Sequence, residues 1–437
     1  MADRPCIAVV SPFLDKRHGT ERCVAEQVER LARQYGYEVH LYCQRVEDIE
    51  GLDQLRTGDL LPGLPGAGES KSASRAQMSG RILWHRISDV PGPHLVKYVW
   101  WFLANQFRRW RDQRLRGLQF DLVYSPGINC WDADAVGVHM VFHEYFRVIR
   151  DELRLRRNPL RAWPRVLHRR LYYRLIMALE KRIYPSPRVT LAAVSRVTAE
   201  EIRRYFGRED VYVIPNAVNV QSFHPSVREA RRPEVRKRMR FDGGQFVLLL
   251  VGNDWKNKGL TCLLEALARC SDLPVHVLVV GRDNRAPYQA TIQQLGLEGS
   301  VSFFEPSADV MQFYAAADAC VAPSLRDAFN LAVAEAMACG LPVIVSERAG
   351  VSELIHDGVD GLTLRDPRDA SELARLIRLL YENSDVRLRV AQNAARLALQ
   401  LSWERNAEQT RTFLECGRKR KNRGVSGAVS WRSSSPK

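Results

Sequence analysis

Two carboxylates spaced eight residues apart are the first chemical feature of this sequence. Asp327 lies in a loop after an apolar segment, and Glu335 lies within a helix predicted over residues 331–339. Alanines flank Glu335, which indicates a buried helix, and a buried carboxylate needs hydrogen-bond donors. Hydroxyl groups of a sugar or a ribose would supply them. The structural alternative makes Asp327 a helix cap and Glu335 a salt-bridged core residue.

Backbone amides and one lysine add a candidate anion site. The amides of Phe329, Asn330 and Leu331 precede the same helix, where N–H groups lack intrahelical acceptors and attract anions. A second loop, residues 251–259, joins an apolar strand to a helix and carries Lys258. Because a lysine at a helix start is electrostatically unfavourable by itself, Lys258 indicates a bound phosphate. The alternative is a solvated turn with a surface lysine.

Two further candidates lie in the first half of the chain. Gly19 belongs to the first strand-to-helix loop, where a glycine lets a ligand approach the backbone closely. His139 ends a strand predicted over residues 135–139, so it faces the edge where parallel sheets bind ligands. An ordinary turn and a structural histidine are the alternatives. Neither a Ser-His-Asp order nor a zinc-type set accompanies them in the sequence.

These residues are distributed over two series of strand-like runs that alternate with helical patterns. The first series comprises residues 7–12, 39–43, 121–124, 135–139 and 189–194. The second series comprises residues 246–251, 275–280, 301–304, 319–322 and 343–345. Buried runs that alternate with helices are typical of parallel sheets covered on both faces. The sequence therefore predicts an α/β protein with two doubly wound domains.

A chain of 437 residues is long enough for two such domains. Proline, arginine and polar residues interrupt the pattern at 215–240, so we expect domains over residues 1–220 and 221–401. Doubly wound sheets bind ligands beyond the carboxyl ends of their strands. Two domains facing each other would form a central cleft lined by the candidate residues.

The net charge of +15 is concentrated in two segments. Residues 145–188 contain 13 Lys or Arg against 3 Asp or Glu, and residues 417–437 contain seven Lys or Arg and no acid. Such segments suit an anionic partner, such as membrane phosphate or a lipid-linked saccharide. We recognise no nucleic-acid-binding module. The tail over residues 417–437 is expected to be disordered.

A helical segment over residues 94–118 combines aromatic residues with arginines. Its apolar residues recur at helical spacing, namely Val96, Val99, Leu103, Phe107 and Trp110. Its arginines follow at Arg108, Arg109, Arg111, Arg114 and Arg116. This combination suits a membrane interface, and the basic segment 145–188 would strengthen the attraction to anionic lipid. The alternative is a helix packed on the N-terminal sheet with a solvated basic face.

Cysteine use and hydropathy bear on the compartment. The nine cysteines are dispersed without a CxxC pair, which suits a reducing compartment. The first residues show no basic-then-apolar leader, and no apolar run reaches the roughly 18 residues needed to cross a bilayer. We therefore expect a cytoplasmic protein that attaches peripherally to the inner face of the plasma membrane.

With these residues in view, the chain resembles the family 4 retaining glycosyltransferases of the GT-B fold, which has two Rossmann-like domains. Residues 323–344, with their two carboxylates, look like that family's donor-binding signature. Residues 251–259 are similar to its phosphate loop, and residues 215–219 to its interdomain segment. Residues 402–416 resemble its closing helix, which returns to the N-terminal domain. Residues 280–318 look most like those of lipopolysaccharide core glucosyltransferases.

The resemblance assigns roles to the candidates in the second half. Asp327 would bind hydroxyls of the donor sugar, Glu335 would bind the ribose, and Lys258 would neutralise the diphosphate. Three backbone amides would hold sugar and phosphate, those of Phe329, Asn330 and Leu331. Asp327 is one methylene shorter than the family's usual glutamate, so the sugar preference can differ.

It also assigns roles to three other residues. Gly19 would contact the donor from the N-terminal domain, and His139 would touch the sugar near the reaction centre. Asn253 would face the donor phosphates at a position where many relatives carry an arginine. His18 replaces the first glycine of the family's usual pair and would crowd the donor. The catalytic set is then His139, Asp327 and Lys258.

The implied reaction transfers a glucose-type hexose from a nucleoside diphosphate sugar, such as a UDP-sugar, to a saccharide or glycolipid acceptor with retention. No cofactor or metal is implied, because Lys258 and helix amides can stabilise the departing diphosphate. Two alternatives are a nucleotide-sugar epimerase and a non-catalytic lipid-binding relative. An epimerase would convert the donor without any acceptor.

Overall fold

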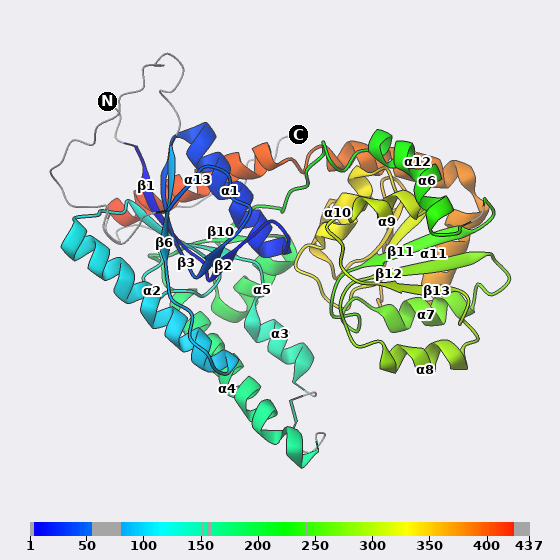
Figure 1. Cartoon of the computed structure of the whole chain (residues 1–437), viewed down its shortest axis with the longest axis horizontal. Helices are drawn as coiled ribbons and strands as arrows, with labels where there is room; N and C mark the ends of the chain where they lie inside the picture. Colours follow the sequence, from blue (N-terminus) through cyan, green and yellow to red (C-terminus); the bar gives the residue numbers. More distant parts are fainter. Residues whose placement is uncertain (1–3, 55–79, 151–152, 155–158, 242, 424–437) are drawn as a thin grey trace. The chain divides into compact units, whose positions relative to one another are not determined.

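The computed structural model describes residues 4–54, 80–150, 153–154, 159–241 and 243–423. The chain divides into two compact units, which Figure 1 colours along the sequence. Unit 1 comprises residues 1–194, 198–214 and 407–437, and unit 2 comprises residues 195–197 and 215–406. The chain thus divides after residues 214 and 406, where we expected divisions after residues 220 and 401.

Unit 1 is built on an eight-stranded sheet in which every pair of neighbouring strands is parallel. In spatial order its strands are β10 (Val211–Val213), β9 (Thr190–Ala193), β8 (Ala135–Val138), β7 (Leu122–Pro126), β1 (Cys6–Val10), β3 (Glu38–Cys43), β6 (Arg81–Arg86) and β5 (Leu52–Gln54). A separate pair joins β2 (Phe13–Leu14) to β4 (Arg45–Val46). The strand order reverses between β1 and β7, as in a doubly wound sheet.

Helices cover this sheet and bury its apolar side chains. They are α1 (Gly19–Tyr35), α2 (His94–Arg116), α3 (Phe142–Ile149), α4 (Trp163–Ile183) with the short η2 (Leu160–Ala162) before it, α5 (Arg196–Phe206) and α13 (Trp403–Asn422). The C-terminal helix α13 packs on the sheet through Phe413 and Leu414, so it returns to the N-terminal unit as expected. A side chain at Gly417 would collide with Leu122 of β7, which shows how closely this helix approaches the strands.

Unit 2 is built on a six-stranded parallel sheet with the same reversal. Its spatial order is β13 (Val301–Phe304), β12 (Val275–Val280), β11 (Phe246–Val251), β14 (Ala319–Ala322), β15 (Val343–Ser346) and β16 (Leu362–Leu364). The two central strands, β11 and β14, are continuous apolar runs, because both faces of the sheet are buried. The switch in strand order falls between β11 and β14, the position where such sheets bind ligands.

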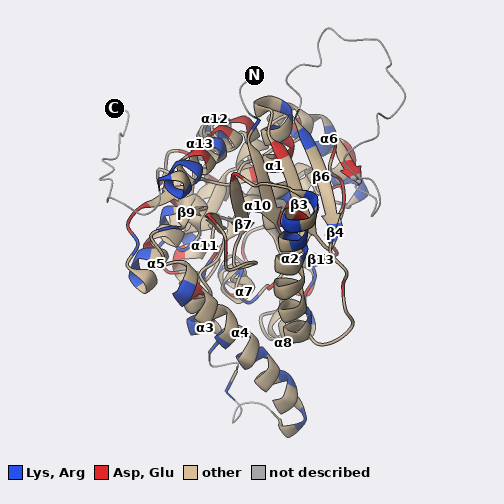
Figure 2. Ribbon diagram, turned by 90° about the vertical axis from the view of Figure 1, so that its left-hand side faces the viewer, with Lys and Arg blue, Asp and Glu red and all other residues tan. Residues whose placement is uncertain are grey.

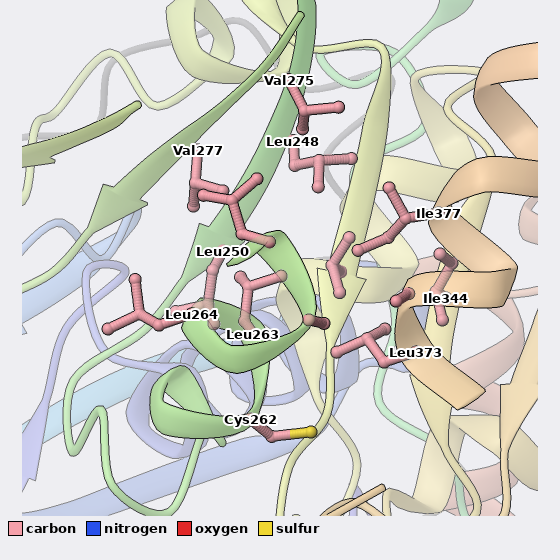
Figure 3. Close-up of a cluster of buried hydrophobic side chains, with 14 of the residues drawn as sticks. Leu248, Leu250, Cys262, Leu263, Leu264, Val275, Val277, Ile344, Leu373 and Ile377 are labelled. Carbon is pink, nitrogen blue, oxygen red and sulfur yellow. The ribbon is translucent and has the colours of Figure 1, made fainter. Parts of the chain in front are cut away.

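The helices of unit 2 are α6 (Pro225–Arg238), α7 (Leu260–Ala268), α8 (Ala286–Gln294), α9 (Met311–Ala316), α10 (Leu331–Ala338), η3 (Gly350–Leu354), α11 (Ala370–Glu382) and α12 (Ser384–Ala398). Figure 3 shows how α7 and α11 close one apolar layer over the strands. Leu263 and Leu264 of α7 meet Leu248 and Leu250 of β11, and Ile377 of α11 completes the cluster. This core fixes the loops that leave β11 and β14.

The prediction of two Rossmann-like domains is confirmed, but several predicted elements have other bounds in the structure. Residues 417–422 belong to α13, because this part of the basic tail continues the helix across the sheet. Residues 424–437 lie outside the described residues. Helix α10 ends at Ala338, one residue earlier than predicted, and β8 ends at Val138, so His139 follows the strand and does not belong to it. Within the described part of the chain, no helix combines the length and apolar character that crossing a membrane requires.

Candidate functional site

Two loops of unit 2 meet at the switch point of the sheet. One leads from β11 to α7 and the other from β14 to α10, and the parallel pairing of β11 with β14 brings them to the same edge. Hydrogen bonds join them, since the Leu325 amide donates to the Asn257 carbonyl at 2.7 Å and Asn257 Nδ2 donates to the Arg326 carbonyl at 2.8 Å. Gly259, at φ 79°, packs so closely that a Cβ would lie 2.0 Å from the Pro323 carbonyl oxygen.

The structure brings two of the predicted site residues together as an ion pair. Lys258 Nζ lies 2.6 Å from Asp327 Oδ2, and both side chains are largely buried. The lysine reaches the carboxylate by crossing Gly252, where a Cβ would lie 2.5 Å from Lys258 Cε. Asp327 therefore neutralises Lys258 without any ligand. A phosphate is therefore not needed to neutralise this lysine, although its position in the sequence indicated one, because the carboxylate comes from 69 residues away.

The amides before α10 are not equivalent. The Phe329 amide donates a hydrogen bond of 3.2 Å to Asp327 Oδ1. Contrary to our expectation, this amide is therefore not available to a ligand. In the described part of the chain, we find no acceptor for the amides of Asn330 and Leu331. Asn330 is the residue that precedes α10, with φ 75° and ψ 75°, and its side chain caps nothing. The alternative role of Asp327 as the helix cap is therefore excluded, and two amides are left to bind an anion.

Glu335 lies in the second turn of α10 and is 6% exposed. The hydroxyl of Tyr314, on α9, donates a hydrogen bond of 2.8 Å to Glu335 Oε2. Burial and the neighbouring Glu335 raise the pKa of Tyr314 well above its ordinary value, so the phenol remains a donor. Tyr314 thus orients the carboxylate. We did not identify it as a site residue from sequence, although it lies within the segment that carries the family resemblance.

Asn253 has a structural contact at the same edge. Its side-chain oxygen Oδ1 accepts a hydrogen bond of 2.8 Å from the Arg282 amide, which ties the loop after β11 to the loop after β12. The exposed guanidinium of Arg282 lies 3.3 Å from Glu305. From the resemblance we expected Asn253 to contact only the donor phosphates. The structure adds this second role to Asn253.

The candidates of unit 1 follow two different strands. Gly19 is the exposed first residue of α1, after a loop in which Asp15 Oδ1 accepts from the Arg17 and His18 amides at 2.8 and 2.9 Å. His139 follows β8 directly and is half-buried. Burial lowers the pKa of His139 to about 4, so its imidazole is neutral near pH 7. A neutral imidazole can donate or accept a hydrogen bond but adds no positive charge.

The lowered pKa of His139 predicts a pH dependence of stability. Between pH 6.5 and 4 the unfolded chain binds a proton at this side chain that the native chain does not, so stability falls as the pH falls. This protonation lowers the free energy of unfolding by about 2 kcal/mol between pH 7 and pH 5. We expect His139→Gln to remove that part of the loss, measured by urea unfolding of the full chain at both pH values. Equal losses for the variant and the wild type would refute a buried, neutral His139.

One group of described residues has the geometry of metal ligands, and it lies outside these loops. Cys6, Glu38 and His40 of unit 1 bring one ligand atom each to within 4.8 Å of one another. His40 is already bonded to Glu38 at 2.9 Å and to His85 at 2.8 Å. Burial raises the pKa of the Cys6 thiol to about 12, with help from Glu38 and Asp121. The group belongs to β1 and β3 of unit 1, whereas Lys258, Asp327 and Glu335 belong to unit 2.

Comparison with known proteins adds independent information. Residues 17–222 match the model of glycosyltransferase family 4, and residues 231–397 match the model of glycosyl transferases group 1. The chain is 31% identical over 210 residues to an N,N'-diacetylbacillosaminyl-diphospho-undecaprenol alpha-1,3-N-acetylgalactosaminyltransferase of Campylobacter jejuni, covering 47% of this chain and 55% of that protein. It is 32% identical over 157 residues to the lipopolysaccharide glucosyltransferase WaaG of Escherichia coli, covering 35% and 42%. The chain thus spans about half the length of the curated relatives it matches.

Solved structures agree at the level of the fold. The crystal structure of WaaG superposes with a TM-score of 0.68 at 20% identity, over 92% of this chain and 98% of that one. HepE of Anabaena, solved with UDP and glucose, superposes with a TM-score of 0.63 at 20% identity, over 94% and 100%. Two consecutive family domains, both Rossmann-like, identify this chain as a member of the family 4 glycosyltransferases with the GT-B fold.

Proposed function

We propose that this protein transfers a hexose from a nucleoside diphosphate sugar to a saccharide or lipid-linked saccharide acceptor, with retention of anomeric configuration. One observation carries the proposal: Lys258 and Asp327 lie on two joined loops at the switch point of a doubly wound sheet, and Glu335 lies on the helix that follows the second loop. That edge is where such sheets bind nucleotides. Two of the relatives named above transfer N-acetylgalactosamine and glucose, and HepE binds UDP-glucose, which favours UDP-sugars as donors.

In the proposed complex the diphosphate replaces Asp327 on Lys258. A diphosphate carries more charge than a carboxylate, so it competes well for the ammonium group. The amides of Asn330 and Leu331 would supply further donors at the start of α10. The released carboxylate of Asp327 would then accept hydroxyls of the sugar, while Glu335 would accept those of the ribose. The donor thus exchanges one ion pair for another instead of entering a preformed cationic site.

Lysine and amides would stabilise the departing nucleoside diphosphate by charge alone. The acceptor hydroxyl would attack from the side of the leaving group, and the leaving phosphate would take its proton. Neither carboxylate acts as a nucleophile, unlike in glycoside hydrolysis. The neutral imidazole of His139 would contribute a hydrogen bond to the sugar. The reaction requires no metal on this account, so transfer is expected to persist in excess EDTA.

A two-step assay tests the proposal. A panel of UDP- and GDP-sugars is first screened for thermal stabilisation of the full chain, since a bound donor stabilises the folded state. The stabilising donor is then incubated with and without lipid-linked saccharide. Acceptor-dependent release of nucleoside diphosphate is the expected result. Conversion of the donor sugar without acceptor would indicate an epimerase, and binding without turnover would indicate a non-catalytic relative.

We further propose that α2 holds the protein against an anionic membrane at the cytoplasmic face. The helix packs on the sheet through Trp101, Phe102, Asn105, Arg109 and Asp112. The apolar residues that recur at helical spacing are on the opposite, exposed face, namely Val96, Val99, Leu103, Phe107 and Trp110. The neighbouring helix α4 and η2 before it also expose apolar side chains, namely Leu160, Trp163, Leu167 and Leu171. An exposed row of this kind suits the headgroup boundary of a bilayer.

The arginines of α2 do not all contribute to this surface. Arg109 is buried and pairs with Asp132 at 2.7 Å, while Arg108 and Arg116 lie 3.2 and 3.6 Å from Asp112. These three side chains therefore fold back onto acids of the unit and add no unpaired positive charge to the exposed face. Two remain without an acidic partner among the described residues, Arg111 and Arg114. They give the apolar row the positive charge that an anionic leaflet attracts.

Replacing Phe107 and Trp110 together by glutamate is expected to weaken binding to anionic vesicles at least tenfold. The two side chains are 62% and 52% exposed, so the change removes apolar contact and adds repulsion without disturbing the core. Co-sedimentation with phosphatidylglycerol vesicles at moderate salt measures the effect. Leu388→Glu, at a 60% exposed site on α12 of unit 2, is the matched control. Wild-type binding by the double variant would exclude α2 as the membrane contact.

A further inference from the structure

A cavity of about 500 Å³ lies between three helices of unit 1. Its walls come from α3, α4 and α5, and Figure 2 shows Lys and Arg along all three helices. On α4 the lining side chains Arg174, Ala178 and Lys181 recur at helical spacing on one face. On α3 and the residue after it, Phe146 and Arg150 do the same. Several basic side chains therefore line the same cavity.

Most of this positive charge has no compensating acid among the described residues. Arg150, Arg174 and Lys181 have no acidic partner among the described residues. Arg147 also lines the cavity, but both oxygens of Glu144 lie 3.0 Å from its Nε atom. Like charges that share a partly enclosed space repel one another. A bound anion would remove this repulsion.

Among the described residues, the acids nearest the cavity already have hydrogen-bond partners. Besides Arg147, Glu144 accepts a hydrogen bond of 2.7 Å from the Tyr205 hydroxyl. Glu180 is fully buried and caps the start of α3, accepting from the Phe142 amide at 2.8 Å and lying 2.6 Å from His143 Nδ1. Burial, with a contribution from Lys181, lowers the pKa of His143, in accord with a positive environment. Glu144 and Glu180 thus hold the helices that line the cavity in place. The three cations without an acidic partner still line it.

The apolar side chains that line the cavity favour a phosphate ester over a free inorganic anion as its ligand. Phe146 and Met177 line the cavity beside the cations. A free inorganic anion would gain nothing from these two side chains, whereas the carbon atoms of a phosphate ester would pack on them. The cavity is also near the sheet edge that carries His139, because α3 follows β8 and α5 follows β9.

We propose that this cavity binds a phosphate or diphosphate ester carried by the acceptor. The phosphate chemistry follows from the cations and the apolar lining, and its assignment to the acceptor rests on the proposed function. The cations would position the acceptor through its phosphate, away from the bond that forms. The site would therefore determine which acceptors the protein selects and leave the affinity for the donor unchanged.

Binding of inorganic pyrophosphate tests the phosphate chemistry without any turnover. The titrations use the full chain with Lys258→Ala, which weakens anion binding at the donor loops. Adding Arg174→Gln and Lys181→Gln is expected to weaken pyrophosphate binding at least tenfold in calorimetry at physiological salt. The matched control is Arg182→Gln, which removes an exposed charge from the same helix outside the cavity. Equal affinities for the double variant and the control would overturn the proposal.

Transfer and vesicle assays separate the sources of the phosphate. With Lys258 intact, Arg174→Gln with Lys181→Gln is expected to raise KM for a phosphorylated acceptor at least tenfold and to change UDP affinity less than twofold. An unchanged acceptor KM, or loss of phosphatidylglycerol vesicle binding as large as the loss of pyrophosphate binding, would contradict the assignment to the acceptor. Absence of transfer by the wild type would contradict the proposed function but would leave the pyrophosphate result intact.

Discussion

Replacing Glu335 by alanine is expected to lower sugar transfer at least a thousandfold while the chain stays folded. The loss corresponds to about 4 kcal/mol of transition-state stabilisation. It is large because the proposed role of this buried carboxylate is to hold the ribose, on which the position of the whole donor depends. Initial rates of nucleoside diphosphate release, with saturating acceptor, measure the effect.

The fold is expected to tolerate this change. Alanine suits α10, which is already rich in alanine, and Tyr314 keeps a partner because its hydroxyl also lies 3.2 Å from the Ala332 carbonyl. Thermal unfolding close to that of the wild type is the control. Glu298→Ala, at an exposed acid elsewhere in unit 2, provides a matched variant that should retain full activity. Transfer by Glu335→Ala at a tenth of the wild-type rate or more would contradict the role of this carboxylate.

Replacing Lys258 by alanine is expected to lower transfer by a similar factor and to weaken UDP binding at least tenfold. The ammonium group is the cation that the diphosphate would meet, so its loss affects both binding and departure of the leaving group. It also leaves Asp327 without its partner at 2.6 Å, which adds repulsion toward any phosphate. Calorimetry with UDP and initial rates measure the two effects separately.

The exchange of ion pairs makes a contrasting prediction for the partner. Asp327→Asn removes the carboxylate that competes with diphosphate for Lys258, so UDP binding should tighten about fivefold, or roughly 1 kcal/mol. Transfer should fall nevertheless, because the sugar loses an acceptor for its hydroxyls. Weaker UDP binding by Lys258→Ala and tighter binding by Asp327→Asn would together show that Asp327 and the diphosphate compete for Lys258. Weaker UDP binding by Asp327→Asn would mean that the pair is a purely structural contact.

The sequence predicted four strands of unit 2 well, because three of them are buried on both faces and the edge strand β13 is still a mostly apolar run. The runs at β11, β12, β13 and β14 were predicted to the residue. The three-residue edge strands β10 and β16 were not predicted, since such short runs carry too few apolar positions to form a pattern. In α2 the apolar spacing predicted a helix face, but spacing alone does not tell which face is buried.

The candidate donor site could likewise be predicted only in part from the sequence. The spacing of Asp327 and Glu335 placed them in a loop and a helix, which is where they lie. Their partners come from elsewhere in the chain: Lys258 is 69 residues from Asp327, and Tyr314 is 21 residues from Glu335. Both contacts depend on the tertiary arrangement of the sheet and its helices, which no local pattern contains. Sequence therefore predicted the acids and missed what holds them.

A crystal structure of the full chain with bound UDP would be decisive for the proposed donor site. We predict that the diphosphate lies within hydrogen-bond distance of Lys258 Nζ, that the ribose hydroxyls bind Glu335, and that Asp327 is displaced from the lysine. UDP bound elsewhere, or a diphosphate distant from Lys258 while its ion pair with Asp327 stays closed, would contradict it.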